Sequence, residues 1–317
     1  MKRSSNAMVP PVSRCFDMKS HEDFICLSMD KNPLHADPQA ARRLLFGRQV
    51  VHGIHGMLWA LDRLPEDTAG GFPKISELKC EFTGSIHIDD HVALNWVEGN
   101  QSGYKGSLLV EGRVVTRLVV ETDSGMRSEG PKIPGPPPEP LVCREVLAED
   151  LAGCSGKVPI GFSMDLARKL FPRLVDNLSC ARFASLLSAT RLVGMECPGL
   201  HSIFSGLKVA FHEWDELLSP QMVYQVVSWQ PNTGLIRIKI QSPQVQGTLE
   251  CFHRPAPKLQ PTMSEIVPRV KPEEFAGQHA LVVGGSRGLG ELTAKILGAG
   301  GAQVTITYHT PVCGTCQ

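Results

Sequence analysis

The sequence predicts an α+β fold that is built twice and followed by a parallel β-α-β segment. In each half, an apolar helical stretch precedes a run of strands separated by glycine-rich or charged turns, which is typical of a helix packed on an antiparallel sheet. The segment Leu207–Phe211 repeats the pattern of Leu78–Phe82, so the halves are interpreted as repeats. A glycine-rich turn between two short apolar strands marks the third part.

Composition narrows the class of protein. The chain has 317 residues, and 32 basic residues balance 32 acidic ones, so no net field attracts nucleic acid or an anionic membrane. We find no secretory signal and no apolar run near the ~20 residues of a membrane span. The cysteines are mostly scattered singly, as in reduced proteins, and the C-x-x-C of Cys313 and Cys316 has no second pair. We expect a cytoplasmic protein without a metal site.

The first repeat is predicted at residues 15–128, after a disordered lead-in at residues 1–14. Residues 15–28 should form an initial strand. Asn32-Pro33 and Asp37-Pro38 each place a capping side chain before a proline, so a short helix should begin at each. Residues 54–64 are apolar on most faces, as in a buried helix. The strands that follow are predicted at Lys74–Phe82, His91–Glu98, Tyr104–Glu111 and Val114–Thr122.

The second repeat is predicted at residues 143–255, between two linkers. Residues 129–142 are too rich in proline for a helix or a sheet ladder and should form a stiff linker. One long helix is expected at residues 166–193. Strands should follow at Ser202–Phe211, Met222–Gln230, Leu235–Gln241 and Gln246–His253. Residues 256–275 are again rich in proline and are interpreted as a second linker.

Candidate catalytic residues lie in the stretch Asp30-Lys31-Asn32-Pro33-Leu34-His35. The turn at Asn32-Pro33 places Asp30 just before it and His35 on it, so both side chains can face one pocket. A carboxylate beside an imidazole can hold a water molecule and remove its proton near neutral pH. Farther on, Val50-Val51-His52-Gly53 leads into the buried helix, and backbone N–H groups at a helix start can hold a developing oxyanion.

The order D-x-N-P-L-H, an alanine-rich helix and V-V-H-G resembles the MaoC-like (R)-specific enoyl-thioester hydratases. Their hot-dog fold is an antiparallel sheet wrapped around a central helix, and the resemblance therefore implies a tandem, or double, hot dog. It covers roughly the first 125 residues well and continues loosely to about residue 255. It implies that Asp30 and His35 activate water while the Gly53 amide polarises a thioester carbonyl.

Three further residues, Asn32, His52 and His55, are candidate substrate-binding residues, although His55 is more simply a packed or rim histidine. The sequence also departs from the family. Many members carry a serine on the helix after His-Gly, where this chain has residues 57–61, Met-Leu-Trp-Ala-Leu. The second repeat has no D-x-N-P-x-H, so we interpret it as a degenerate half that shapes the acyl pocket.

The resemblance implies reversible hydration of trans-2-enoyl thioesters, or dehydration of (R)-3-hydroxyacyl thioesters, on coenzyme A or acyl carrier protein and without a cofactor. One alternative is a hot-dog thioesterase, in which water attacks the carbonyl. Another is a non-catalytic acyl-thioester-binding module that keeps the motif. As a purely structural alternative, Asp30 is a cap and His35 a surface histidine. A homodimer is left open.

The last part, residues 276–317, has the β-turn-α-β order of a dinucleotide fingerprint. Gly284, Gly288 and Gly290 lie between an apolar strand and a helix, where glycines let the backbone approach a pyrophosphate. Their spacing resembles short-chain dehydrogenase/reductases, and Arg287 would suit the 2′-phosphate of NADP. Because no Tyr-x-x-x-Lys follows, we expect a truncated reductase of a dehydratase–ketoreductase fusion, with NADP bound only by a full-length reductase domain.

Overall fold

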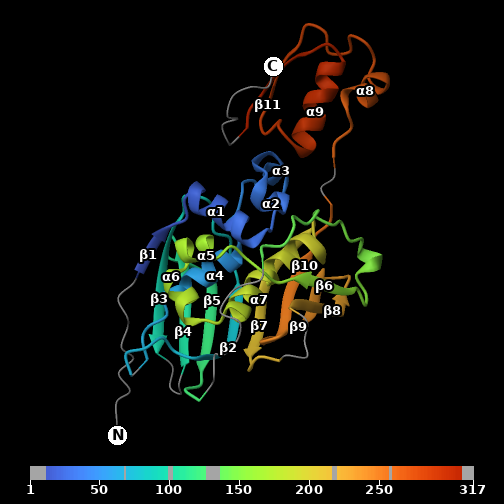
Figure 1. Ribbon diagram of the computed structural model, residues 1–317. Coiled ribbons are helices and arrows are strands. Elements are labelled where there is room, and N and C mark those ends of the chain that lie inside the picture. Colours follow the sequence, from blue (N-terminus) through green and yellow to red (C-terminus); the bar gives the residue numbers. More distant parts are fainter. Residues whose placement is uncertain are drawn as a thin grey trace. The chain divides into compact units, whose positions relative to one another are not determined.

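A single ten-stranded antiparallel sheet organises the first of two compact units, Met1–Pro255 (Figure 1). The computed structural model describes residues 12–67, 69–98, 103–125, 136–215, 220–256 and 259–308. Cys313 and Cys316 lie outside these residues. Within them, no helix has both the length and the apolar character needed to cross a membrane.

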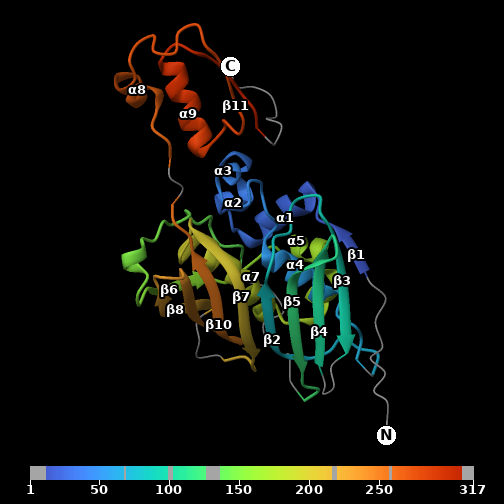
Figure 2. The ribbon, with the colours of Figure 1, turned by 180° about the vertical axis from the view of Figure 1, so that it is seen from behind.

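Each half of the sheet has the same strand order. The strands of the first half are β1 (Val12–Cys15), β2 (Ile75–Phe82), β3 (His91–Glu98), β4 (Gly103–Val110) and β5 (Arg113–Thr122). Those of the second half are β6 (Ser155–Pro159), β7 (Ser202–Phe211), β8 (Gln221–Gln230), β9 (Leu235–Ser242) and β10 (Val245–His253). The sheet runs β1-β3-β4-β5-β2-β7-β10-β9-β8-β6, so the second half mirrors the first (Figure 2). This topology is the predicted tandem repeat.

The two halves join where β2 pairs with β7. Leu78 lies opposite Val209 and Cys80 opposite Leu207, so the segments whose likeness suggested the repeat are hydrogen-bonded neighbours. All four of these side chains are buried. The sheet therefore continues across the boundary between the repeats, and one apolar layer lies beneath both halves.

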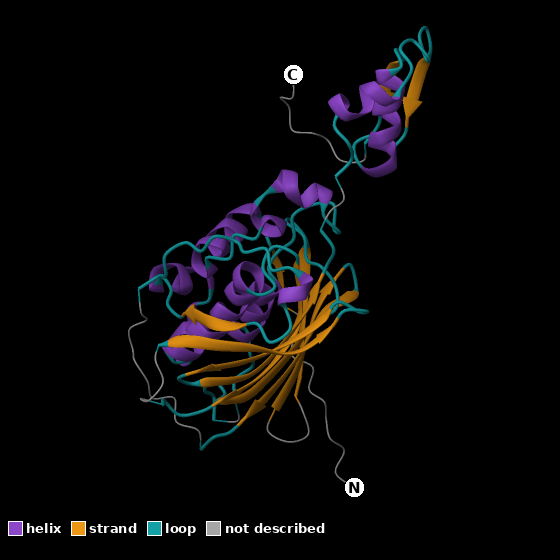
Figure 3. Cartoon of the chain, turned by 90° about the vertical axis from the view of Figure 1, so that its right-hand side faces the viewer, coloured by secondary structure: helices purple, strands orange, loops and turns teal. Residues whose placement is uncertain are grey.

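Helices cover one face of this sheet (Figure 3). The central helix of the first half, α4 (Gly53–Asp62), is buried along its length after Gly53 and packs on β4 and β5. The central helix of the second half, α7 (Cys180–Arg191), packs on β6 and β10 and also contacts α4. Side chains from both helices belong to one hydrophobic core.

The start of the chain differs from the prediction. Residues 15–28 were expected to form a strand, but Met18–Ser28 form helix α1, capped by the Asp17 side chain, which accepts from the Ser20 N–H. Its buried residues include His21, Phe24 and Leu27. This three-residue spacing is the helical signal that the strand interpretation missed. Strand β1 begins at Val12, inside the predicted disordered lead-in, and pairs with β3.

Other helices follow their caps. Helices α2 (Pro33–Ala36) and α3 (Pro38–Arg43) begin at the predicted prolines, with Asn32 and Asp37 as N-caps. The predicted long helix at residues 166–193 is instead α5 (Met164–Leu170), α6 (Pro172–Asn177), α7 and a π-helical turn, η2 (Leu192–Glu196). Pro172 ends the first of these because it has no N–H to donate. The sequence analysis also missed β6 and a 3₁₀ turn, η1 (Ala148–Asp150).

The second unit, Ala256–Gln317, contains the predicted β-α-β order. Strands β11 (His279–Val282) and β12 (Gln303–Ile306) pair in parallel, and helix α9 (Gly288–Ala299) connects them. Helix α8 (Met263–Ile266) and the 3₁₀ turn η3 (Val267–Arg269) lie in the segment predicted to be a linker. A capping box between Thr262 and Glu265 stabilises α8, and this local signal was overlooked because of the prolines around it.

The junction between the repeats gives a stability prediction. Leu78 is fully buried there, so Leu78→Ala should lower the free energy of unfolding of the first unit by about 2–5 kcal/mol. The matched control is Val227→Ala on β8, because Val227 is 55% exposed and its change should stay within about 0.5 kcal/mol. Denaturant unfolding followed by tryptophan fluorescence tests this, since all four tryptophans lie before residue 255. Equal effects of the two substitutions would contradict the shared core.

Candidate active site

Asp30 lies in the interior, directly after α1. Met29 ends that helix in the left-handed conformation, with φ 57°, and turns the chain so that the Asp30 carboxylate points inward, where the residue is 1% exposed. Its Oδ1 accepts from the backbone N–H of Asn32 at 3.1 Å, and its Oδ2 accepts from the Thr190 hydroxyl at 2.7 Å. Asp30 is therefore a buried carboxylate with dedicated hydrogen-bond donors, rather than a cap or a residue on a pocket rim.

His35 and His52 face this carboxylate. The Nδ1–H of His35 donates to the carbonyl of Val50 at 2.8 Å, which leaves its Nε2 with a free lone pair. The His52 ring stacks on the His35 ring, with centroids 3.7 Å apart. His52 Nε2 lies 3.2 Å from the Asp30 carbonyl oxygen and 3.5 Å from Asp30 Oδ2. Both neighbours are acceptors, so this nitrogen carries the proton.

Burial shifts the pKa of Asp30, His35 and His52 in the direction that favours the uncharged form of each group. It raises the pKa of Asp30, against the opposing effects of His35, the Thr190 hydroxyl, the Asn32 N–H and Arg191. Burial likewise lowers the pKa of His35, and it lowers that of His52 well below the usual value. The Asp30 carboxyl group, whose pKa is raised, and an unprotonated imidazole nitrogen of His35 thus share a largely buried site.

Gly53 lies next to His52 at the first position of α4, where backbone N–H groups have no acceptor within the helix. The ring of Phe82 packs against it, and a Cβ built on Gly53 would lie 2.8 Å from that ring. Only glycine at this position allows Phe82 to pack so closely. The structure brings Gly53 beside the cluster of Asp30, His35 and His52.

Asn32 and His55 are both buried in the described part of the chain. Asn32 caps α2 through Oδ1, and its Nδ2 donates to the carbonyls of Gly194 at 2.9 Å and Gly199 at 3.1 Å, so it ties the catalytic turn to the second repeat. His55 is fully buried and stacks parallel to Phe24 at 4.4 Å. Both side chains are enclosed by protein, and their predicted contact with a substrate stays a prediction.

The sequence analysis missed the residues that α7 contributes. Thr190 contacts Asp30 although they are 160 residues apart in the chain, and the neighbouring Arg191 is fully buried. Arg191 Nε donates to the carbonyl of Ser28 at 2.9 Å, and burial lowers its pKa to about 10. Nothing in a helix of alanine, serine and leucine distinguishes these positions before folding. A hydroxyl thus reaches the carboxylate from the second repeat, while α4 has no serine at residues 57–61.

Three potential metal ligands meet here, because one atom each of Asp30, His35 and His52 lies within 4.8 Å of the others. A ligating imidazole nitrogen must be unprotonated. His52 Nε2 faces two acceptors and carries its proton, so this nitrogen offers no lone pair, and the unprotonated Nδ1 of the same ring is buried without a hydrogen-bond partner among the described residues. Asp30 and the unprotonated Nε2 of His35 both present acceptor atoms to this point, so a water molecule there could donate a hydrogen to each.

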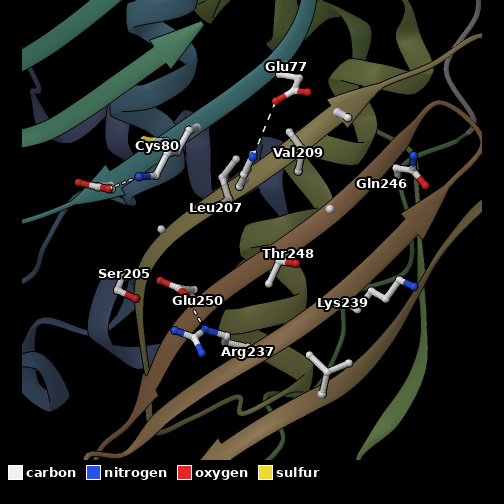
Figure 4. Close-up of a pocket in the computed structure, with 17 residues that line it drawn as sticks. Glu77, Cys80, Ser205, Leu207, Val209, Arg237, Lys239, Gln246, Thr248 and Glu250 are labelled. Atoms are coloured by element: carbon white, nitrogen blue, oxygen red, sulfur yellow. Dashed lines mark hydrogen bonds and ion pairs between the residues drawn. The ribbon is translucent and has the colours of Figure 1, made fainter. Parts of the chain in front are cut away.

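A separate hollow of about 760 Å³ lies on the outer face of the sheet, over β2, β7, β9 and β10 (Figure 4). None of the candidate catalytic residues lines it. Six of its charged residues form three ion pairs: Lys79 with Glu81 at 2.7 Å, Arg237 with Glu250 at 2.8 Å, and Lys208 with Glu77 at 3.9 Å. This hollow is the solvated face that an antiparallel sheet commonly has.

In the second unit, the predicted cofactor glycines gather at the start of α9. Gly284 and Gly288 have φ of 74° and 59°, a region that favours glycine. A Cβ on Gly290 would lie 2.3 Å from the carbonyl oxygen of Gly284, so only glycine allows the helix to pack against the turn. Arg287 is the N-cap residue of α9. The predicted glycine turn is thus present between β11 and α9.

Comparison with known proteins shows which family the first repeat resembles. Residues 9–119 match the family model described as MaoC like domain. A solved structure described as a MaoC-like dehydratase has a TM-score of 0.50 and 12% identity, over 78% of this chain and 97% of its own. A MaoC-domain protein from Chloroflexus aurantiacus J-10-fl has a TM-score of 0.51 and 10% identity, over 79% of this chain and 96% of its own. Among curated proteins, none matches the sequence.

Residues 9–119 are therefore a MaoC-like domain, and the unit as a whole has the hot-dog fold. The predicted resemblance of the first repeat to MaoC-like proteins is confirmed for these residues. The similarity to solved structures extends across both repeats, in agreement with the shared sheet.

The buried histidines give a pH prediction. Burial holds the pKa of His55 well below that of an unfolded histidine, near 6.5, so below that pH the unfolded chain binds more protons and stability falls. Compared with His55→Phe, the parent should lose up to about 1.4 kcal/mol per pH unit between pH 6.5 and pH 5. Denaturant unfolding measured from pH 5 to pH 8 tests this. Above pH 7 the difference should be constant, and a constant difference at every pH would refute a buried neutral His55.

Proposed function

We propose that the chain is a hydro-lyase that adds water reversibly to a trans-2-enoyl thioester, or removes it from the (R)-3-hydroxyacyl thioester. The observation that carries this proposal is the approach of the Asp30 carboxylate and the His35 imidazole beside the first amides of α4. The MaoC-like family of the first repeat supports it, because its members are typically hydratases and dehydratases.

The chemistry assigns one task to each group. A water molecule between Asp30 and His35 Nε2 donates one hydrogen to each, and Asp30 removes the proton as the oxygen attacks C3 of the substrate. Electron density moves to the thioester oxygen, which the Gly53 N–H stabilises. The proton then passes from Asp30 to C2, so that H and OH have been added across the double bond. A carboxyl group with a raised pKa is suited to return this proton.

The two alternatives differ in their products. A thioesterase would direct the same water at the thioester carbonyl and release free thiol from saturated acyl thioesters. A binding module would retain the thioester unchanged. We would incubate the full chain with enoyl, 3-hydroxyacyl and saturated thioesters of coenzyme A and of acyl carrier protein, and identify the products by mass. A gain of 18 mass units on the enoyl substrate supports the hydratase.

Substitution of the two catalytic residues should abolish most of this turnover. Asp30→Asn removes the proton acceptor and His35→Ala removes the second contact to the water, so each should lower hydration about 10²–10⁴-fold. The double variant should lose less than the product of the single effects, because both groups act on one water molecule. Initial rates with a medium-chain enoyl thioester measure this.

The control for these variants is Asp37→Asn, seven residues farther along, where an exposed carboxylate only caps α3. It should keep the parent rate. Melting temperatures are needed for every variant, because Asp30 is buried and its replacement can also change stability. Full turnover in well-folded Asp30→Asn and His35→Ala proteins would remove both residues from the mechanism.

For the second unit we propose that its glycine turn does not bind NADP by itself. Only β11 and β12 pair among the described residues of this unit, and Leu281 and Val283 are 64% and 79% exposed. Parallel sheets that bind dinucleotides are normally covered on both faces. Titration with NADP or NADPH should give no saturable signal at micromolar concentrations. A stoichiometric isotherm that is lost in Arg287→Ala would instead assign a cofactor site to this turn.

A further inference from the structure

The second repeat encloses the carboxylate of Asp30, although it has no catalytic motif. Thr190 near the end of α7 is 4% exposed, and its hydroxyl lies 2.7 Å from Asp30 Oδ2. The π-helical turn η2 follows immediately. A Cβ on Gly194 in this turn would lie 2.4 Å from Asp30 Oδ1, so the turn closes around the carboxylate with no space for a side chain. Asn32 then fastens the two repeats together through the Gly194 carbonyl.

We propose that Thr190 is the positioning residue of the catalytic carboxylate, so that the degenerate repeat supplies the hydroxyl that orients the base. This inference rests on the proposed hydratase function. A threonine hydroxyl that donates to Oδ2 restricts the rotation of the carboxylate. It also stabilises the ionised form, which is the form that accepts the proton of water.

Charged and titratable groups approach Asp30 from every side. Arg191 comes from α7, His35 from α2, and His52 from the start of α4. Cys143, before β6, also lies near, and burial together with the Asp30 charge raises its pKa to about 12. Of the uncharged groups, the Asn32 N–H and the Thr190 hydroxyl donate directly. Thr190 can be changed without altering any of the charged groups, so its effect on Asp30 can be measured alone.

The test compares Thr190→Val, which keeps the shape, with Thr190→Ser, which keeps the hydroxyl. We expect Thr190→Val to lower kcat/KM about 10–100-fold at pH 7 through loss of a hydrogen bond to a charged group. The acidic limb of its pH profile should move to higher pH, because the ionised carboxylate has lost a donor. Thr190→Ser should keep the acidic limb of the parent. The control is Thr248→Val on the outer face, which should change neither quantity.

A second measurement separates this inference from the proposed function. In protein labelled with ¹³C-aspartate, the Asp30 carboxyl signal is assigned by its loss in Asp30→Asn, and its titration needs no turnover. We expect it to titrate at higher pH in Thr190→Val than in the parent. If no thioester is hydrated, the proposed function fails, and the titration still tests the contact.

A folded Thr190→Val protein with the parent's titration and acidic limb would overturn the positioning role and leave Thr190 as a packing residue. If Thr190→Val does not fold, Thr190→Ala replaces it in both measurements. Thr190→Ala should then behave as described for Thr190→Val, whereas Thr190→Ser should follow the parent. Identical titrations in Thr190→Ala and Thr190→Ser would reject the proposal.

Discussion

The structure around the site depends on the burial of one carboxylate. Moving an ionised carboxyl group out of water costs far more free energy than the surrounding apolar burial contributes, unless hydrogen-bond donors of the protein replace the water. Asp30 receives these donors from its own turn and from α7 of the other repeat. The hydrogen bond between Thr190 and Asp30 therefore requires a fixed relative position of the two repeats. The continuous pairing of β2 with β7 holds them in that position.

The same exclusion of water acts in opposite directions on the acid and the bases. It raises the pKa of Asp30 and lowers those of His21, His35 and His52, which lie close together behind the catalytic turn. His21 donates through Nε2 to the His35 carbonyl at 2.9 Å and so holds the turn without adding a charge. A carboxyl group of raised pKa can both accept a proton and return it, as the proposed reversible hydration requires.

The two repeats share a topology but have taken different tasks. The first carries the turn with Asp30 and His35 and the start of α4. The second has a π-helical turn that packs closely around Asp30 and accepts one hydrogen bond from Asn32 through the Gly194 carbonyl. Such turns insert an extra residue into a helix and often lie at functional sites. The second repeat, which lacks the D-x-N-P-x-H motif, is thus still needed to enclose Asp30.

Local signals in the sequence determined much of this protein. The caps at Asn32 and Asp37, the alternating strands and the β-α-β order concern residues within a few positions of each other, and each appears in the structure. A local signal was also present for α1, in the spacing of its buried residues, although a strand was predicted there. The motif placed Asp30, His35 and Gly53 together because they belong to one connected stretch.

Only the tertiary structure decided how that site is enclosed. The contact of Thr190 with Asp30, the burial of Arg191 and the inward position of His55 depend on how α7 packs beside α4. No periodicity or cap encodes a partner 160 residues away, because the pairing is set by the sum of many apolar contacts across the shared sheet. The residues of the turn are therefore set by the local sequence, whereas the burial and hydrogen bonds that shift their pKa values are set by the whole fold.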